Sequence, residues 1–400
     1  MKSTPKTTPR QAWADWLLLV FFGALLWLPT VDYFGHLDWT KPLDENRLLA
    51  PRPRLTRLDV SGLRDYFAAA EAGFNDHFGF RRRLVRWCQQ WKEQIYRGGR
   101  GANKVIEGQN GWLYFSEGQM IEHYLGLNQF TPRQLESWQR LLEKRRDWLA
   151  ARGIKYLFLI PPDKQTVYGE NLPKWLANAR PAGCQTKLDQ FVQYMQAHST
   201  VEILDLRQPL SAAREFAPTY LQNDTHWNLY GGFIGSQELI RALSRQLPEL
   251  RPLRLEDFDW TNVPATGGDL ARMLGRPDKP EKNSIGFTPK PPLGALQSRP
   301  ITNFARMWNQ KHPTQPDCLV ENTNLPAPAV DVVVFHDSYG MALRQSLGYG
   351  CHRVVFVWEN QECNPRIIAE YHPQIVVTET LERLLNIADP DRILANEVLP

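Results

Sequence analysis

Short apolar runs alternate with amphipathic stretches along most of this chain. The runs rich in β-branched residues predict strands at about 154–160, 201–204, 332–335, 354–357 and 375–378. Because these runs are almost continuously apolar, they indicate strands buried on both faces, as in a parallel sheet covered by helices. The pattern therefore predicts an α/β fold with a mostly parallel sheet.

Helical spacing of apolar residues predicts helices at 131–153, 186–198 and 229–243. The first is the clearest, since Thr131 is a favoured N-cap residue and Gln134 can complete a capping box. Helices of this kind, placed between buried strands, predict helical layers on both faces of the sheet.

Two segments depart from this alternation. The residues at 105–115 predict two short strands joined by an Asn-Gly turn. The residues at 261–328 contain many Pro, Gly and Asn, and they predict a long insertion over the sheet edge. Long irregular segments of this kind are often functional.

The N-terminus has the pattern of a membrane segment. Lys2, Lys6 and Arg10 precede an apolar run from Trp16 to Val31. This run is near the lower limit for a span, which needs about 17 to 25 residues, so a cleaved signal peptide is the alternative. No A-x-A cleavage site follows the run and aromatic residues flank it, which favours an uncleaved anchor.

Positive charge on the N-terminal side of that run predicts that this end lies in the cytoplasm. The sequence thus predicts a single-pass inner-membrane protein of a bacterium, with its main domain in the periplasm. The predicted parts are a cytoplasmic N-terminus at 1–15, a transmembrane helix at 16–34, a proline-rich linker at 35–57 and a periplasmic domain at 58–400.

Composition excludes several classes of protein. With 400 residues, of which 42% are hydrophobic and 22% charged, the chain can bury a large core. The net charge of +4 comes from scattered Lys and Arg residues and indicates no nucleic-acid surface. The glycine-rich tract at 98–104 lacks the Gly-Lys-Ser/Thr ending of a phosphate loop. The five cysteines are too irregularly spaced for a disulfide framework or a zinc site, and no cofactor is predicted.

The segment at 223–228 carries an acid and an imidazole at a useful spacing. Asp224 and His226 are two positions apart, so in extended backbone both side chains leave the same face and the carboxylate can reach the ring. Asn228 is a favoured N-cap for the helix that follows. A positive helix end beside His226 predicts a neutral imidazole, as a general base requires.

The segment at 332–340 supplies a hydroxyl. Ser338 follows a buried strand, at the edge of the sheet where α/β folds bind ligands. We expect the backbone N–H groups at the start of the next helix to stabilise negative charge that develops on a substrate carbonyl oxygen. The alternative is that Ser338 merely caps that helix. Together with Asp224 and His226, it completes the residue types of an activated serine nucleophile.

Several segments, taken together and in order, resemble one family, the AlgX/AlgJ-like SGNH-hydrolase domain of bacterial alginate and exopolysaccharide O-acetylation proteins. The matching segments read FNDHFGFR at 74–81, GWLY at 111–114, PDKQTVY at 162–168, NDTHWN at 223–228, GGDLA at 267–271 and HDSYG at 336–340.

This resemblance implies an SGNH-type α/β/α sandwich in which Ser338 is the nucleophile, His226 the base and Asp224 its orienting acid. It also implies a function, polysaccharide O-acetyltransferase in the periplasm, working through an acyl-serine intermediate. A membrane-bound O-acyltransferase is the implied partner that supplies the acetyl group, and an alginate-like or other exopolysaccharide is the implied substrate. The chain departs from GDSL esterases because His336 and Asp337, not glycine, precede the serine.

Other residues are weaker candidates for substrate binding. Trp227 is next to the base and suits a sugar ring, although core packing explains it equally well. Lys164 and Tyr168 follow a strand end, and Asn360 is a candidate oxyanion donor. Two alternative functions stay open: a secreted carbohydrate esterase or deacetylase with the same triad, and a non-catalytic glycan-binding scaffold of an acetylation complex.

Overall fold

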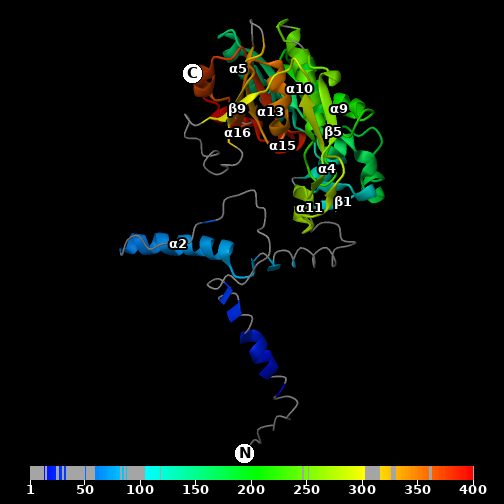
Figure 1. Ribbon diagram of the computed structural model, residues 1–400. Coiled ribbons are helices and arrows are strands. Elements are labelled where there is room, and N and C mark those ends of the chain that lie inside the picture. Colours follow the sequence, from blue (N-terminus) through cyan, green and yellow to red (C-terminus); the bar gives the residue numbers. More distant parts are fainter. Residues whose placement is uncertain are drawn as a thin grey trace, which may run out of the picture. The chain divides into compact units, whose positions relative to one another are not determined.

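The computed structural model describes residues 13, 16–23, 27–28, 31–32, 50, 59–81, 83–84 and 87 near the N-terminus, and 104–117, 119–245, 247–250, 252–301, 316–325, 330–359 and 363–399 in the remainder. The chain divides into two compact units, Met1–Arg100 and Gly101–Pro400. Helix α2 of the first unit spans Val60–His77. All elements described below belong to the second unit (Figure 1).

Seven strands form the main sheet of this unit in the described residues. Strands β10 and β9 run antiparallel to their neighbours and extend the sheet beyond its parallel part, so the sheet is mixed. The predicted strands are all present and are all parallel to one another. In spatial order the strands are β4 (Glu202–Asp205), β3 (Lys155–Ile160), β13 (Ile375–Glu379), β11 (Asp331–His336), β12 (Arg353–Trp358), β10 (Cys318–Glu321) and β9 (Gln297–Pro300).

Alternate residues of the central strands enter two different hydrophobic cores. In β11, Val332 and Val334 pack into one core, whereas Val333 and Phe335 pack into the other. The apolar runs are continuous because each strand must fill both cores. Helices cover both faces, so the predicted α/β/α arrangement is confirmed with a mixed sheet. On the first face lie α9 (Arg207–Ala213), α10 (Leu229–Ser244) and α13 (Gly340–Gly350), and on the second α5 (Pro132–Ala150), α8 (Lys187–His198), α14 (Pro365–Tyr371) and α16 (Pro390–Asn396).

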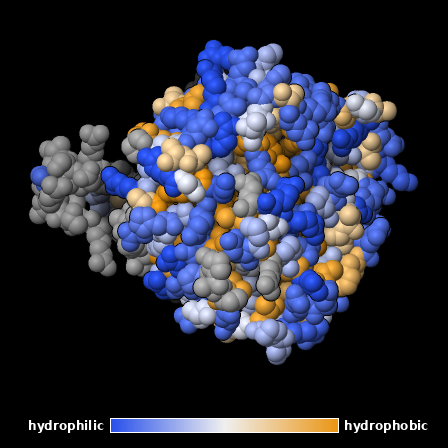
Figure 2. Space-filling view, turned by 90° about the horizontal axis from the view of Figure 1, so that it is seen from above, coloured by the Kyte–Doolittle hydropathy of each residue, from blue (hydrophilic) through white to orange (hydrophobic). Residues whose placement is uncertain are grey.

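Local sequence signals set where the main helices begin. The Thr131 hydroxyl accepts the Gln134 backbone N–H, and the Gln134 side chain accepts the Thr131 backbone N–H, which confirms the predicted capping box of α5. The Asn228 side chain caps α10 through the Gly231 amide, also as predicted. On the face that Figure 2 shows, hydrophilic residues predominate and hydrophobic ones are scattered between them, as expected once both cores are covered.

The remaining elements are short. The strands predicted at 105–115 are confirmed as an antiparallel pair, while the segment at 261–328 is more regular than its composition indicates, since it holds strand pairs, a helix and both antiparallel strands of the main sheet. The exposed residues of β9 carry no apolar alternation that predicts a strand. The short elements are β1 (Val105–Glu107), η1 (Gln109–Gly111), β2 (Leu113–Phe115), α4 (Met120–Tyr124), α6 (Lys164–Val167), η2 (Gly169–Asn171), α7 (Lys174–Ala177), η3 (Leu255–Asp257), β5 (Phe258–Asn262), β6 (Ala265–Thr266), α11 (Asp269–Met273), β7 (Pro280–Glu281), β8 (Ile285–Pro289) and α15 (Glu382–Ile387).

The predicted transmembrane helix at 16–34 needs correction. Of that stretch, the described residues 16–23, 27–28 and 31–32 are helical. Across the described part of the chain, however, no helix combines the length and the apolar character needed to cross a membrane. A span takes about 20 predominantly apolar residues in one helix. This finding contradicts the predicted single-pass inner-membrane localisation.

Candidate active site

Ser338 lies in the tight turn between β11 and α13. Strand β11 ends at His336 and helix α13 begins at Gly340, so Ser338 is at the carboxyl edge of the sheet, as predicted. The Ser338 Oγ is 2.8 Å from the Nε2 of His226, from which it is separated by 112 residues of sequence. Tyr339 holds the N-cap position of α13. The alternative in which Ser338 caps this helix is therefore not the arrangement seen.

Asp224 and His226 occupy the loop that leads into α10. The His226 Nδ1 is 2.6 Å from the Asp224 Oδ1, and the same oxygen accepts the His226 backbone N–H at 3.0 Å. The two-residue spacing does bring carboxylate and imidazole together. Asp224, His226 and Ser338 thus form one continuous chain of hydrogen bonds.

Exposure differs along this chain of three side chains. The Asp224 side chain is 13% exposed and that of His226 is 31% exposed, while Ser338 is half-buried between the buried residues Asp337 and Tyr339. Solvent and ligands therefore reach the hydroxyl and the imidazole, and the carboxylate stays behind them. This gradient suits a nucleophile whose supporting acid is shielded from water.

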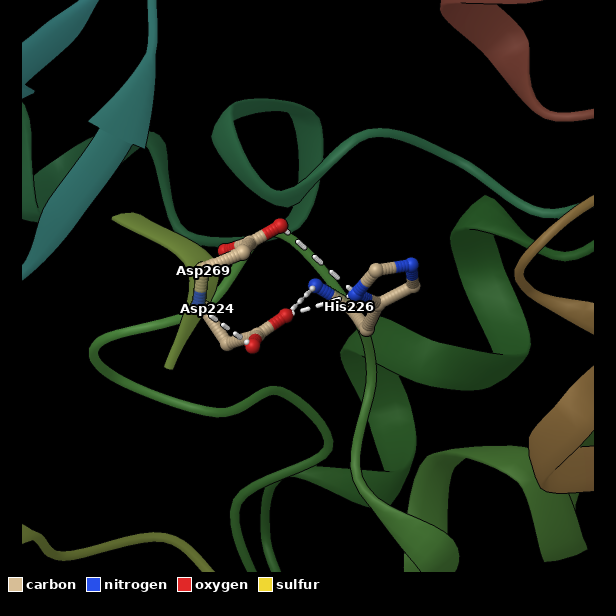
Figure 3. Close-up of side chains that lie close together, drawn as sticks. All are labelled: Asp224, His226 and Asp269. Carbon is tan, nitrogen blue, oxygen red and sulfur yellow. Dashed lines mark hydrogen bonds and ion pairs between the residues drawn. The ribbon is translucent and has the colours of Figure 1, made fainter. Parts of the chain in front are cut away.

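A second carboxylate, Asp269, lies beside Asp224 and approaches the same nitrogen of the His226 ring (Figure 3). Its Oδ2 is 3.8 Å from the His226 Nδ1, and its backbone N–H donates to the Asp224 Oδ2 at 2.8 Å. Asp269 is the first residue of α11, in the irregular segment that follows α10. Sequence reasoning assigned Asp269 no role, although the GGDLA segment that contains it was a visible signal.

The charges around the imidazole decide its protonation. Burial opposes protonation of His226, but the hydrogen bond that its ring donates to Asp224 and the negative charges of Asp224 and Asp269 outweigh this effect and raise the pKa of His226. Burial acts against the ionised form of Asp224 too, yet the hydrogen bond and charge of His226 and two backbone amides lower its pKa. The prediction that a helix end lowers the pKa of His226 is therefore wrong in direction, because the carboxylates of Asp224 and Asp269 favour the protonated ring.

The predicted oxyanion donors are largely occupied. The Tyr339 N–H donates to the Asp337 Oδ1 at 2.9 Å, and the Gly340 N–H donates to the Asp337 carbonyl oxygen at 3.2 Å. Among the hydrogen bonds between described residues, none involves the backbone N–H of Ser338. That amide belongs to the nucleophile itself and is the candidate donor to the charge that would develop.

The four predicted substrate-binding residues are placed differently from one another. Trp227 is only 2% exposed and its indole N–H donates to the Tyr339 carbonyl oxygen at 3.0 Å, so it packs beneath the site. Tyr168 is buried with its ring stacked on Trp112 at 4.3 Å between centroids. Lys164 is buried as well, and Asn360 lies outside the described residues. For the three buried residues, this placement favours a supporting role.

Lys164 supports the loop that carries the acid. Its ammonium donates to the Asp224 carbonyl oxygen at 2.6 Å and to the carbonyl oxygens of Leu221 and Gln222 at 3.2 Å each. Burial lowers the pKa of Lys164 to about 7, against the charges of Asp224 and Asp269. The Lys164 side chain therefore stabilises the backbone of the loop that carries Asp224.

A buried group of charged residues lies under the serine turn. The Asp337 Oδ2 accepts the Leu381 N–H at 2.8 Å, and the Glu379 Oε2 accepts the Asp337 N–H at 3.0 Å. Burial and the charge of Asp337 raise the pKa of Glu379. Arg383 donates to the Asp163 Oδ1 at 2.8 Å. These contacts connect the ends of β3, β11 and β13 around the site.

The Asp224, His226 and Asp269 side chains are close enough together to hold a cation, with ligand atoms within 4.8 Å of one another. Their carboxylate oxygens, however, already accept N–H and O–H donors. Asp224 accepts from His226 and from the Asp269 amide, and Asp269 accepts from Thr225 and from the Leu270 amide. The donor set is that of a hydrogen-bonded network.

Comparison with known proteins agrees with this architecture. Residues 105–289 match the family described as SGNH hydrolase-like domain, acetyltransferase AlgX, a range that includes Asp224, His226 and Asp269 and ends before Ser338. The chain is 26% identical over 227 residues to the probable alginate O-acetylase AlgJ of Pseudomonas syringae pv. tomato, covering 54% of this chain and 55% of that protein. It is 25% identical over 263 residues to the probable alginate O-acetylase AlgJ of Azotobacter vinelandii, covering 62% and 60%.

The chain therefore spans only 55% and 60% of the length of these two relatives. A DHHW family protein from Eubacterium siraeum has the same fold, with a TM-score of 0.52, 12% identity, and coverage of 76% of this chain and 98% of that one. Residues 105–289 therefore match an AlgX-type SGNH hydrolase-like domain, and the chain is similar in sequence to the AlgJ proteins.

Proposed function

We propose that this protein is a polysaccharide O-acetyltransferase that works through an acetyl-serine intermediate on Ser338. The observation that carries the proposal is the hydrogen-bond chain from Asp224 through His226 to Ser338, with the hydroxyl reachable at the carboxyl edge of the sheet. Such a chain supplies a base for the nucleophile and an acid for the base.

In the first half of the reaction, the His226 Nε2 takes the proton of the Ser338 hydroxyl as the Oγ attacks the acetyl carbonyl carbon of the donor. The Ser338 backbone N–H is placed to donate to the oxyanion that forms. The carbonyl then re-forms, the bond to the donor group breaks, and the departing group takes the proton from His226. Asp224 stabilises the imidazolium between these two events.

In the second half, His226 takes the proton from a sugar hydroxyl as that oxygen attacks the acetyl-serine. The ester bond to Ser338 breaks, its Oγ regains the proton from His226, and the acetyl group leaves on the sugar. The names of the relatives, probable alginate O-acetylases, support a polysaccharide acceptor and an acetyl group. A membrane-bound O-acyltransferase that supplies the acetyl group completes the proposal.

The test incubates the full chain with an activated acetyl ester and oligosaccharides, including oligomannuronate. Mass spectrometry should detect an acetyl group on the Ser338 peptide and acetylated sugar in the mixture. Ser338→Ala should abolish both. Ser346→Ala is the matched control, because Ser346 is on α13, the helix that follows Ser338, and its hydroxyl is hydrogen-bonded to that of Ser236 at 2.7 Å and not to His226.

Acetate release with no sugar acetylation would identify an esterase and refute acetyl transfer to sugar. Acetylation of a residue other than Ser338, or full activity in Ser338→Ala, would refute the acyl-serine step.

A further inference from the structure

Asp269 makes contacts with its side chain and with its backbone, and the two sets have different partners. The backbone N–H donates to Asp224. The carboxylate turns to Thr225, the residue between the acid and the base: Oδ2 accepts the Thr225 hydroxyl at 2.5 Å and Oδ1 accepts the Thr225 backbone N–H at 2.7 Å. Close approach of α11 to this loop requires Gly268, since a Cβ there would lie 2.3 Å from the Asn223 carbonyl oxygen.

The Thr225 hydroxyl also faces the histidine ring. Its Oγ1 is 3.3 Å from the His226 Nδ1, the same ring nitrogen that contacts Asp224. A hydroxyl has one hydrogen to donate and two lone pairs. Because the Asp269 carboxylate accepts that hydrogen, the oxygen of Thr225 presents a lone pair to the imidazole.

We infer that Asp269 is a positioning residue that acts through the Thr225 hydroxyl to keep the proton of neutral His226 on Nδ1, an inference that rests on the proposed function. Two acceptors, the Asp224 carboxylate and the Thr225 oxygen, then surround Nδ1. The opposite nitrogen, Nε2, keeps its lone pair and faces the Ser338 hydroxyl. Only this tautomer can take the proton from serine.

The substitution Asp269→Asn separates this role from that of a scaffold. It keeps the size of the side chain and the hydrogen bond from the residue 269 backbone N–H to Asp224. It replaces one acceptor oxygen by an amide donor and removes the negative charge that attracts the hydrogen of the Thr225 hydroxyl. The Thr225 hydroxyl is then able to donate to the His226 Nδ1, which stabilises the wrong tautomer. Removing the hydroxyl as well, in Asp269→Asn with Thr225→Val, leaves Asp224 alone at Nδ1 and should restore the Nδ1–H tautomer.

The experiment records ring nitrogen NMR spectra of the full chain with labelled histidine, across a pH titration. Wild-type protein should show His226 with its neutral proton on Nδ1. Asp269→Asn should show a mixture of tautomers, a His226 pKa about one pH unit lower from the lost charge, and a kcat about tenfold lower with KM unchanged. The charged groups that face His226 are Asp224 and Asp269, which favour its protonation, and Arg383, which opposes it.

Asp189→Asn is the matched control, because Asp189 also accepts the hydroxyl and the amide of a threonine, Thr186, at 2.8 and 2.9 Å, both through Oδ2, at the start of α8. It should change neither the tautomer nor the titration of His226. An Asp269→Asn spectrum identical to wild type would overturn the inference. So would a double variant that keeps the mixed tautomers of Asp269→Asn, since the effect would then not pass through Thr225.

These spectra need no turnover, so they separate this inference from the proposed function. A protein that transfers acetyl groups normally but keeps its tautomer in Asp269→Asn would refute the inference alone. If Asp269→Asn fails to fold, Thr225→Ser and Thr225→Val in the wild-type background keep the test open. Both should retain the Nδ1–H tautomer, and loss of it in Thr225→Ser would contradict the assigned direction of the hydrogen bond.

Discussion

The phenol of Tyr339 donates a hydrogen bond to the carbonyl oxygen of Thr225 at 2.5 Å, across 114 residues of sequence. In return, the Trp227 indole N–H donates to the Tyr339 carbonyl oxygen at 3.0 Å. The residue after the serine therefore holds the residues on both sides of His226. This pair of bonds joins the two distant segments of the site and sets the distance between Ser338 and His226.

Tyr339→Phe should weaken this connection. The buried Thr225 carbonyl loses its partner, which costs about 1–3 kcal/mol in the free energy of unfolding. Acetyl transfer should fall more than stability alone explains, because the His226 loop is no longer held against the serine turn. Denaturant unfolding and initial rates measure the two effects.

Tyr230→Phe is the control for that variant, since its phenol donates to the Ala213 carbonyl oxygen at 3.1 Å, between α10 and α9. It should cost comparable stability and leave the rate near wild type. Equal losses of rate in both variants would show that Tyr339 has no particular part in holding the site.

Gly232→Ala should separate α10 from α13. The two helices lie side by side, and a Cβ on Gly232 would lie 2.5 Å from the Ala342 carbonyl oxygen. Helix α10 follows His226 and helix α13 follows Ser338, so pushing them apart should lengthen the bond between base and nucleophile. We expect a cost of about 1–3 kcal/mol in stability and a larger loss of activity than in Leu243→Ala. Leu243 is buried near the far end of α10. A fully active Gly232→Ala protein would contradict this view of the packing.

The rate of acetyl transfer should depend on the deprotonation of His226. Because the pKa of His226 is raised, kcat/KM should rise with pH through a midpoint above the ordinary histidine value of about 6.5. Asp224→Asn removes the nearest negative charge and the acceptor at Nδ1. Its midpoint should move to lower pH and its maximal rate should fall by up to about 10⁴-fold. A wild-type midpoint below 6 would contradict the assignment of His226 as the base.

Lys164 should make stability depend on alkaline pH. Burial lowers its pKa in the folded protein to about 7, whereas an unfolded lysine titrates near 10.4. Between these values the unfolded chain binds more protons, so the free energy of unfolding should rise as the pH increases from about 7 to about 10. Lys164→Met should lose this rise and should be less stable at its upper end, because three carbonyl oxygens lose their donor.

Lys155→Met is the control for that comparison, since Lys155 is exposed at the start of β3. Its dependence on pH should match that of wild type. Parallel stability curves for wild type and Lys164→Met would refute the prediction.

Much of the scaffold was predictable because its signals are local. Continuous apolar runs report strands that fill two cores, and the caps at Thr131 and Asn228 report helix starts. The contact between Asp224 and His226 was predictable for the same reason, since two residues of backbone set it. Strands β9 and β10 were missed, because an exposed edge strand such as β9 needs no apolar alternation.

By itself, then, the sequence determined the central parallel strands, the main helices and the three side chains able to form the hydrogen-bond chain of the site. Only the tertiary structure decided that Ser338 meets His226, that Asp269 joins them, and that Trp227, Tyr168 and Lys164 are buried. It also decided the direction of the His226 pKa, because that depends on the distances to two carboxylates. The physical reason is that periodicity and caps report neighbours within a few residues, whereas these contacts depend on strand order and on hydrogen bonds to backbone atoms, which every residue type carries.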